Sequence, residues 1–211
     1  MQVSSKRGQS GHRTNGHSPK SQPIIVPVSP DCSPQLYQAN PADSLTPPAH
    51  DRVAIFIDGS NLFYAALHLE LEIDYAKLLC YLTGSRRLLR AYFYTGVDRS
   101  HEKQQGFLLW MRRNGYRVVA KELVPSPDGT KRANLDVEIA VDMMTLASHC
   151  DTMILLSGDG DLTYAVNTVA YLGVQVELVS LQSMTSESLI NVADQYTDLA
   201  TIRAAIQKKR V

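Results

Sequence analysis

Residues 53–59 read Val-Ala-Ile-Phe-Ile-Asp-Gly: five apolar residues that end at an acidic residue and a glycine. A short apolar run closed by polar residues is typical of a strand that is buried on both faces of a parallel sheet. The stretch therefore predicts the first strand of such a sheet, with Asp58 just past its carboxyl end.

Further strand-like runs follow this one at about residues 88–94, 116–124, 153–156 and 174–179. Helix-like stretches separate them, at about residues 60–70, 74–83, 100–114, 134–148 and 162–172. Alternation of strand and helix predicts an α/β domain with a mainly parallel, five-stranded sheet and helices on both of its faces. We expect one or two short helices after the fifth strand.

The composition divides the chain at about residue 50. Eight of its ten prolines, together with eight serines, lie in residues 1–50, which hold few large apolar side chains. Such a segment cannot bury enough apolar surface to offset the entropy of ordering. We therefore expect a disordered Pro/Ser-rich tail at 1–50 and one domain at 51–211, which is long enough to bury a core.

Several classes of protein are excluded at this stage. No apolar run reaches the roughly 18–20 residues that span a bilayer, and the basic N-terminus is not followed by the apolar segment of a secretory signal. Three cysteines, far apart in the chain, argue against a disulfide scaffold and a zinc knuckle. The expected location is the cytoplasm. Basic and acidic residues balance at 21 each, so any polyanion must bind to a local patch.

Acidic residues follow two of the predicted strands directly. Asp58 follows the first strand, with Asn61 three residues later, and Asp159 and Asp161 follow the fourth. Ligands of open α/β sheets bind beyond the carboxyl ends of the strands, so these side chains are candidates for a binding site. The alternative is structural: Asp is also a common helix cap and turn residue.

Two more carboxylates lie on the helix predicted at 134–148. Asp136 shares the apolar, core-facing side of that helix with Ile139 and Met143, where a carboxylate is costly unless it reaches a crevice at the sheet edge. Asp142 and Glu138 lie toward the opposite side of the helix, so a solvated acidic face is the alternative for them.

Asp58, Asp136, Asp159 and Asp161 are therefore expected to converge above one edge of the sheet. Such a cluster of negative charge predicts a bound divalent cation, and its oxygen ligands favour Mg²⁺ or Mn²⁺. A carboxylate-bound metal of this kind typically activates water and stabilises a leaving oxygen in phosphodiester cleavage. Asn61 would hold a water or a ligand without adding charge.

Basic residues gather in three places that could contact phosphates. Arg86, Arg87 and Arg90 precede the second strand, and a second basic group lies within residues 112–121. Lys131 and Arg132 lie just ahead of Asp136. Phosphate binding requires such side chains, although charge runs are often only solvated faces. Lys131 is the strongest candidate, because its loop leads into the acidic site.

Three motifs in this order resemble the NYN domain, and more narrowly its LabA-like (DUF88) group in bacteria. They are Asp58-Gly59-Ser60-Asn61 after the first strand, residues 131–136 at the opening of a helix, and Ser157-Gly158-Asp159-Gly160-Asp161 after the fourth strand. The resemblance covers about residues 51–205. It departs from the family at Leu135, where valine is common.

The resemblance implies a PIN-like, three-layer α/β/α fold and a metal-dependent ribonuclease or RNA-processing protein that acts on RNA. It implies that Asp58, Asp136, Asp159 and Asp161 form the acidic, catalytic site that binds Mg²⁺ or Mn²⁺. Asn61, Lys131 and Arg132 would then bind the substrate, with Asp142, which matches an acidic family position, and Ser157 in supporting places.

The sequence offers two other hypotheses. The resemblance also implies a link to the regulation of gene expression, including clock output, so the chain could bind RNA or a protein, or form an oligomer, without cleaving. Asp159-Gly160-Asp161-Leu162-Thr163 matches the nucleophile loop of haloacid-dehalogenase-type phosphatases. That loop should follow the first strand of the fold, so its position after the fourth strand excludes this class.

Overall fold

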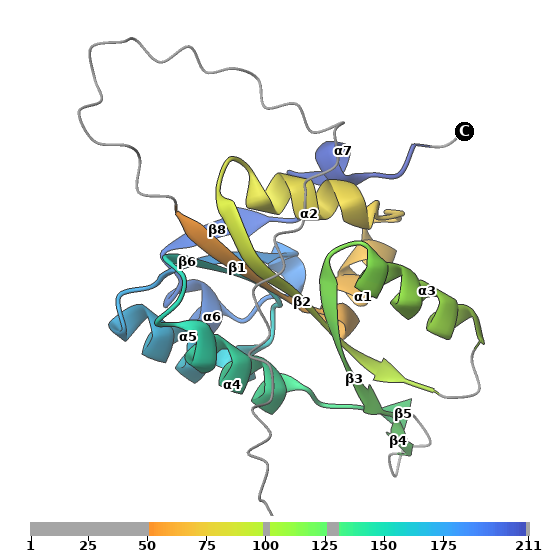
Figure 1. The fold of residues 1–211 in the computed structure, drawn as a ribbon, viewed down its shortest axis with the longest axis horizontal. Coiled ribbons are helices and arrows are strands. Elements are labelled where there is room, and N and C mark those ends of the chain that lie inside the picture. Colours follow the sequence, from red (N-terminus) through yellow and green to blue (C-terminus); the bar gives the residue numbers. More distant parts are fainter. Residues whose placement is uncertain (1–50, 99–101, 126–130, 210–211) are drawn as a thin grey trace, which may run out of the picture.

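The computed structural model describes residues 51–98, 102–125 and 131–209 of the chain, drawn in colour in Figure 1. The predicted tail at 1–50 lies outside these residues. The helices and strands below belong to the described ranges.

Six strands form one sheet in the order β3-β2-β1-β6-β7-β8, and every neighbouring pair is parallel. The α/β class and the parallel sheet are therefore confirmed. A separate antiparallel pair, β4 with β5, precedes helix α4. The strands are β1 (Arg52–Asp58), β2 (Arg87–Val97), β3 (Tyr116–Glu122), β4 (Val124–Pro125), β5 (Lys131–Arg132), β6 (Thr152–Leu156), β7 (Gln175–Ser180) and β8 (Gln195–Asp198).

The helices form a layer on each face of the sheet (Figure 1). One layer holds α1 (Gly59–His68), α2 (Tyr75–Thr83), α3 (Glu102–Arg113) and α7 (Arg203–Ile206). The other holds α4 (Asp136–Leu146), α5 (Thr163–Tyr171) and α6 (Glu187–Ile190). Two short 3-10 turns, η1 (Gly160–Leu162) and η2 (Gln182–Met184), precede α5 and α6. None of the helices in the described ranges has the length and apolar character to cross a membrane.

Strand β1 occupies the centre of the sheet and packs against both helix layers. Val53, Ile55 and Ile57 join the core under α1, α2 and α3, whereas Ala54 and Phe56 join the core under α4 and α5. All five side chains are fully buried. The continuous apolar run thus has the role predicted for it, because each face of a parallel strand meets a helix.

The expected five strands are one too few, since β8 adds a sixth beside β7. Short helices do finish the chain, as expected, but β8 lies between α6 and α7. Its sequence, Gln-Tyr-Thr-Asp, has no apolar run, and none of its residues is fully buried. A short polar strand suits the edge of a sheet, because exposed apolar residues there would promote aggregation. The sequence therefore has no apolar run from which this strand could be predicted.

The strand order reverses between β1 and β6. Along the chain, β2 and β3 are added on one side of β1, and β6, β7 and β8 on the other. Such a reversal opens a crevice beyond the carboxyl ends of the two strands, because their following helices cover opposite faces. Asp58 and Ser157 come at the ends of these two strands.

Candidate metal centre

Asp58 ends β1 where the chain turns into α1. Its Oδ1 accepts hydrogen bonds from the backbone N–H groups of Ser60 (3.0 Å) and Asn61 (3.1 Å). Asp58 is thus the N-cap of α1, the structural role that the sequence left open beside a metal-ligand role. Gly59 has no room for a side chain, because a Cβ there would lie 2.6 Å from the carbonyl oxygen of Tyr94.

Ser157 joins the turn after β1 to the turn after β6. It is only 1% exposed. Its hydroxyl donates to Oδ2 of Asp58 (3.2 Å) and accepts from the backbone N–H of Asp159 (3.2 Å). A hydroxyl can do both, since it has one proton and two lone pairs. Ser157 therefore holds the two acidic turns at a fixed separation.

The turn after β6 is shaped by its glycines. A Cβ at Gly158 would overlap the carbonyl oxygen of Met184, and a Cβ at Gly160 would lie 2.8 Å from the hydroxyl of Ser186. Within the turn, Oδ1 of Asp159 accepts from the backbone N–H of Asp161 (3.0 Å) and caps η1. The turn thus packs against the segment before α6 and presents Asp159 and Asp161 at the crevice.

Asp136 is the first residue of α4 and is half-buried. Its backbone N–H donates to Oδ1 of Asn134 (2.9 Å). The Lys121 ammonium fixes the same helix start, because it donates to the carbonyl oxygen of Asn134 (2.9 Å) and to Oε1 of Glu138 (2.8 Å). The buried Ile139 confirms which side of α4 faces the core.

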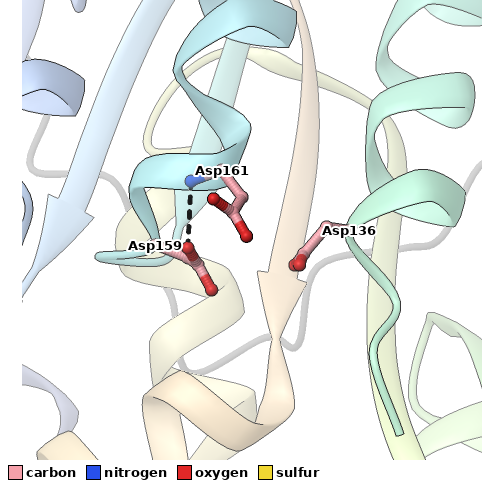
Figure 2. Close-up of side chains that lie close together, drawn as sticks. All are labelled: Asp136, Asp159 and Asp161. Carbon is pink, nitrogen blue, oxygen red and sulfur yellow. Dashed lines mark hydrogen bonds between the residues drawn. The ribbon is translucent and has the colours of Figure 1, made fainter.

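Three carboxylates meet in the crevice, one from α4 and two from the turn after β6. Figure 2 shows Asp136 on one side, facing Asp159 and Asp161 on the other. One oxygen of each lies within 4.8 Å of the others. Such a spacing fits three ligands of a single cation, and the group contains only carboxylate oxygens, the ligands that hard cations such as Mg²⁺ and Mn²⁺ prefer.

The electrostatics of the crevice favour a positive charge. Burial raises the pKa of the Asp136 carboxyl above its ordinary value, and the negative charges of Asp159, Asp58 and Asp161 raise it further. Burial also raises the pKa of Asp58, with a smaller contribution from Asp159, although hydrogen bonds from Asn61, Ser157 and Ser60 act in the opposite direction. Both ionised carboxylates are thus held at a cost that a bound cation would relieve.

Asp58 lies beside the three-carboxylate group rather than in it. Its charge acts on Asp136, which places it nearby, but both of its oxygens already accept hydrogen bonds. The group that could share one ion consists of Asp136, Asp159 and Asp161. Asp58 adds negative charge to the crevice and orients the turn.

Asp142 and Asn61 occupy supporting places. Oδ2 of Asp142 accepts a hydrogen bond from the hydroxyl of Tyr94 (2.9 Å), which ties α4 to β2. Asp142 lies outside the three-carboxylate group, six residues beyond Asp136 on α4. Asn61 is half-buried in the first turn of α1, where its backbone N–H binds Asp58.

Lys131 and Arg132 form β5, the strand that leads into α4. Arg132 is exposed, and the side chain of Lys131 lies outside the described part of the structure. The pairing of β5 with β4 puts Val124 opposite Arg132. Arg132 lies four residues before Asp136, so this basic pair leads into the start of α4.

Two residues of the site were not anticipated from the sequence. Asn134 caps the backbone N–H of Asp136, and an Asn two residues before an acidic helix start is a signal that could have revealed it. Tyr94 binds Asp142 from a neighbouring strand. No local pattern announces that contact, because it joins residues 48 positions apart.

Comparisons with known proteins agree with this arrangement. The NYN domain model matches residues 52–200. The chain is 36% identical over 165 residues to the low amplitude and bright protein LabA of Synechococcus elongatus, covering 74% of this chain and 88% of LabA. A crystal structure of a protein of unknown function from Vibrio parahaemolyticus superimposes with a TM-score of 0.68. It covers 78% of this chain and 100% of its own, and at 23% identity it supports the fold alone.

The matched region begins at the first residue of β1 and ends after β8, so it contains the whole sheet and all the acidic residues described above. The family model covers well over half of the chain, and the LabA match is long and shared by most of both proteins. The chain is therefore a member of the NYN domain family and a homologue of LabA.

Proposed function

We propose that this protein is a Mg²⁺- or Mn²⁺-dependent ribonuclease that hydrolyses phosphodiester bonds of RNA. The observation that carries the proposal is the convergence of Asp136, Asp159 and Asp161 in the crevice between β1 and β6. Membership of the NYN family, a PIN-like nuclease family, supports it. Single-stranded RNA is the proposed substrate.

The residues of the crevice would have different roles in this reaction. Asp136, Asp159 and Asp161 would hold the metal, and Asp58 would add charge beside them. When bound there, the ion would lower the pKa of a water ligand and offset charge on the leaving oxygen. Ser157 keeps the turns of Asp58 and Asp159 in place.

Substrate binding is assigned to neutral and basic residues around the carboxylates. Asn61 can contact a substrate oxygen without adding negative charge to the crevice. Lys131 and Arg132 lie on the strand that leads into α4, which suits them to bind phosphates of the RNA next to the one that is cleaved. Removal of Lys131 should mainly weaken RNA binding and reduce its dependence on salt.

A second candidate function is favoured by the 36% identity with LabA. In this alternative the protein regulates gene expression, including clock output, by binding RNA or a protein partner without cleavage. The fold and the acidic crevice would be retained, and an oligomer or a partner protein would carry the signal.

Cleavage of a labelled single-stranded RNA with Mg²⁺, with Mn²⁺ and with EDTA tests the proposal. Asp161→Asn is the sharpest variant, because the Asp161 side chain caps neither α1 nor η1. We expect it to lower the metal-dependent rate by about 100-fold or more, because loss of even a residue that only supports a metal ligand typically costs about 10–100-fold. Asp151→Asn, which makes the same change at the opposite end of β6, should cleave like wild type.

Two outcomes decide between the candidates. If wild-type protein binds RNA but cuts it with neither metal, the regulatory function replaces the ribonuclease. If Asp161→Asn cuts as fast as wild type, the cleavage does not come from this crevice. A thermal shift on adding Mg²⁺, smaller in Asp161→Asn than in Asp151→Asn, would show independently that the ion binds the native cluster.

A further inference from the structure

Helix α5 carries two tyrosines whose rings are almost fully in solvent. Tyr164 is 82% exposed and Tyr171 is 85% exposed. Both lie away from the side of α5 that packs on the sheet, which consists of Ala165, Val166 and Val169. The two residues differ in their distance from the acidic crevice, because they stand at opposite ends of the helix.

Tyr164 lies beside the candidate metal centre. The turn η1 runs directly into α5, so Asp161 and Tyr164 are three residues apart in one helical segment. Side chains three residues apart lie on one face of a helical segment, whether it is a 3-10 turn or an α-helix. Tyr171 is seven residues farther along, which is about 10 Å along a helix axis.

The opposite side of the crevice has a similar exposed apolar side chain. Val137 follows Asp136 at the start of α4 and is 69% exposed. Helices α4 and α5 pack side by side. An exposed apolar side chain therefore lies next to the carboxylates on both sides: Val137 follows Asp136 on α4, and Tyr164 follows the turn of Asp159 and Asp161 at the start of α5.

We propose that Tyr164 is a platform on which an unpaired base of the nucleic acid stacks, next to the phosphate that a cation bound by Asp136, Asp159 and Asp161 would contact. The inference rests on the proposed ribonuclease function and specifies its substrate. An exposed ring binds any base by its flat face, without reading its sequence. Bases inside a duplex are already stacked and cannot reach it, so the subsite selects single-stranded nucleic acid.

The test is the affinity for a labelled single-stranded RNA, measured by fluorescence anisotropy with Ca²⁺ in place of Mg²⁺. Tyr164→Ala should weaken binding by about tenfold, or about 1.4 kcal/mol, which lies within the range found for one stacked base. Tyr164→Phe keeps the ring and should bind within about twofold of wild type. Tyr171→Ala, an equally exposed tyrosine on the same helix, should also bind within about twofold.

A second readout locates the base. RNA carrying 2-aminopurine next to the cleaved position should lose fluorescence on binding to wild type, because stacking quenches that base. Tyr164→Ala should abolish the quenching, and Tyr171→Ala should retain it. Duplex RNA should bind wild type and Tyr164→Ala equally.

The outcomes separate this inference from the proposed function. Wild-type protein that cleaves RNA while Tyr164→Ala binds it unchanged overturns the stacking platform alone. Equal losses in Tyr164→Ala and Tyr171→Ala overturn it too, since they would indicate a general effect of the α5 surface on RNA binding. Wild-type protein that binds no RNA overturns both.

Discussion

Asp136 illustrates at the scale of one residue how position changes the cost of a charge. The first turn of a helix favours a negative side chain, because the backbone N–H groups there carry partial positive charge. Burial and three neighbouring carboxylates nevertheless raise the pKa of Asp136. These effects exceed the opposing hydrogen bond from Asn134, so the ionised form of Asp136 is unfavourable in the metal-free protein.

This pKa shift predicts a pH dependence of stability without divalent cation. Because the folded protein holds the proton of Asp136 more tightly than the unfolded chain, this group stabilises the fold below its ordinary pKa of 3.8 and loses that contribution as pH rises through the raised value. Asp136→Asn should therefore gain stability relative to wild type between about pH 4 and 7. Urea unfolding in EDTA across this range measures the difference.

Added Mg²⁺ should reverse that comparison at pH 7, because the ion stabilises wild type more than the variant. A stability difference that stays constant from pH 4 to 7 in EDTA would contradict the assignment of a raised pKa to Asp136.

The candidate site is built from two neighbouring strand–turn–helix units. Strands β1 and β6 are parallel neighbours, and each is followed by an acidic turn that opens a helical segment. Asp58 caps α1 and Asp159 caps η1. These carboxylates thus cap a helical segment and add negative charge to the crevice at once, so a cap role does not exclude a place at the candidate site.

Ser157→Ala tests the link between these two units. The change leaves Oδ2 of Asp58 and the backbone N–H of Asp159 without their shared partner, which should destabilise the protein by about 1–3 kcal/mol. Ser183→Ala, an exposed serine of η2, should stay within about 0.5 kcal/mol of wild type. Urea unfolding measures both, and a loss in Ser157→Ala no larger than in Ser183→Ala would remove Ser157 from this role.

The sequence predicted the elements that carry an apolar signal and the residues that follow them. The run at 53–57 and the acidic turns after two strands were enough to locate the crevice, since parallel strands end at one edge of the sheet. Strand β8 was missed because it is short and polar. The Tyr94–Asp142 contact was missed because it depends on how α4 packs over β2, which no local spacing encodes.

The two ends of the domain differ in the contacts that their residues make with the rest of the fold. At the start, β1 pairs with β2 and β6, so the buried residues of β1 find their neighbours inside the described region. At the end, Leu199, Ile202 and Ile206 are buried in the core. The backbone there is bonded to the α1–α2 connection, from Asp74 N–H to Ile206 O and from Lys208 N–H to Glu72 O.

Truncation should therefore have opposite effects at the two ends. A chain that begins at Asp51 should melt at the same temperature as the full chain. A chain that ends before Leu199 should lose on the order of 5 kcal/mol, since three buried apolar side chains contribute about 1.5–3 kcal/mol each. Thermal melts followed by circular dichroism measure both, and a clear drop on removing residues 1–50 would show that they pack on the domain.

The close packing of Gly158 and Gly160 against residues 184–186 has a consequence for redesign of the protein. The acidic turn rests on a segment that contributes no ligand, so the position of Asp159 and Asp161 depends on the length and shape of that support. Lengthening the support by one residue should move the turn as a body and change which ionic radius the crevice accepts. Residues 184–186 are therefore the place at which the spacing of Asp159 and Asp161, and with it the metal preference of the proposed site, can be changed while every carboxylate is kept.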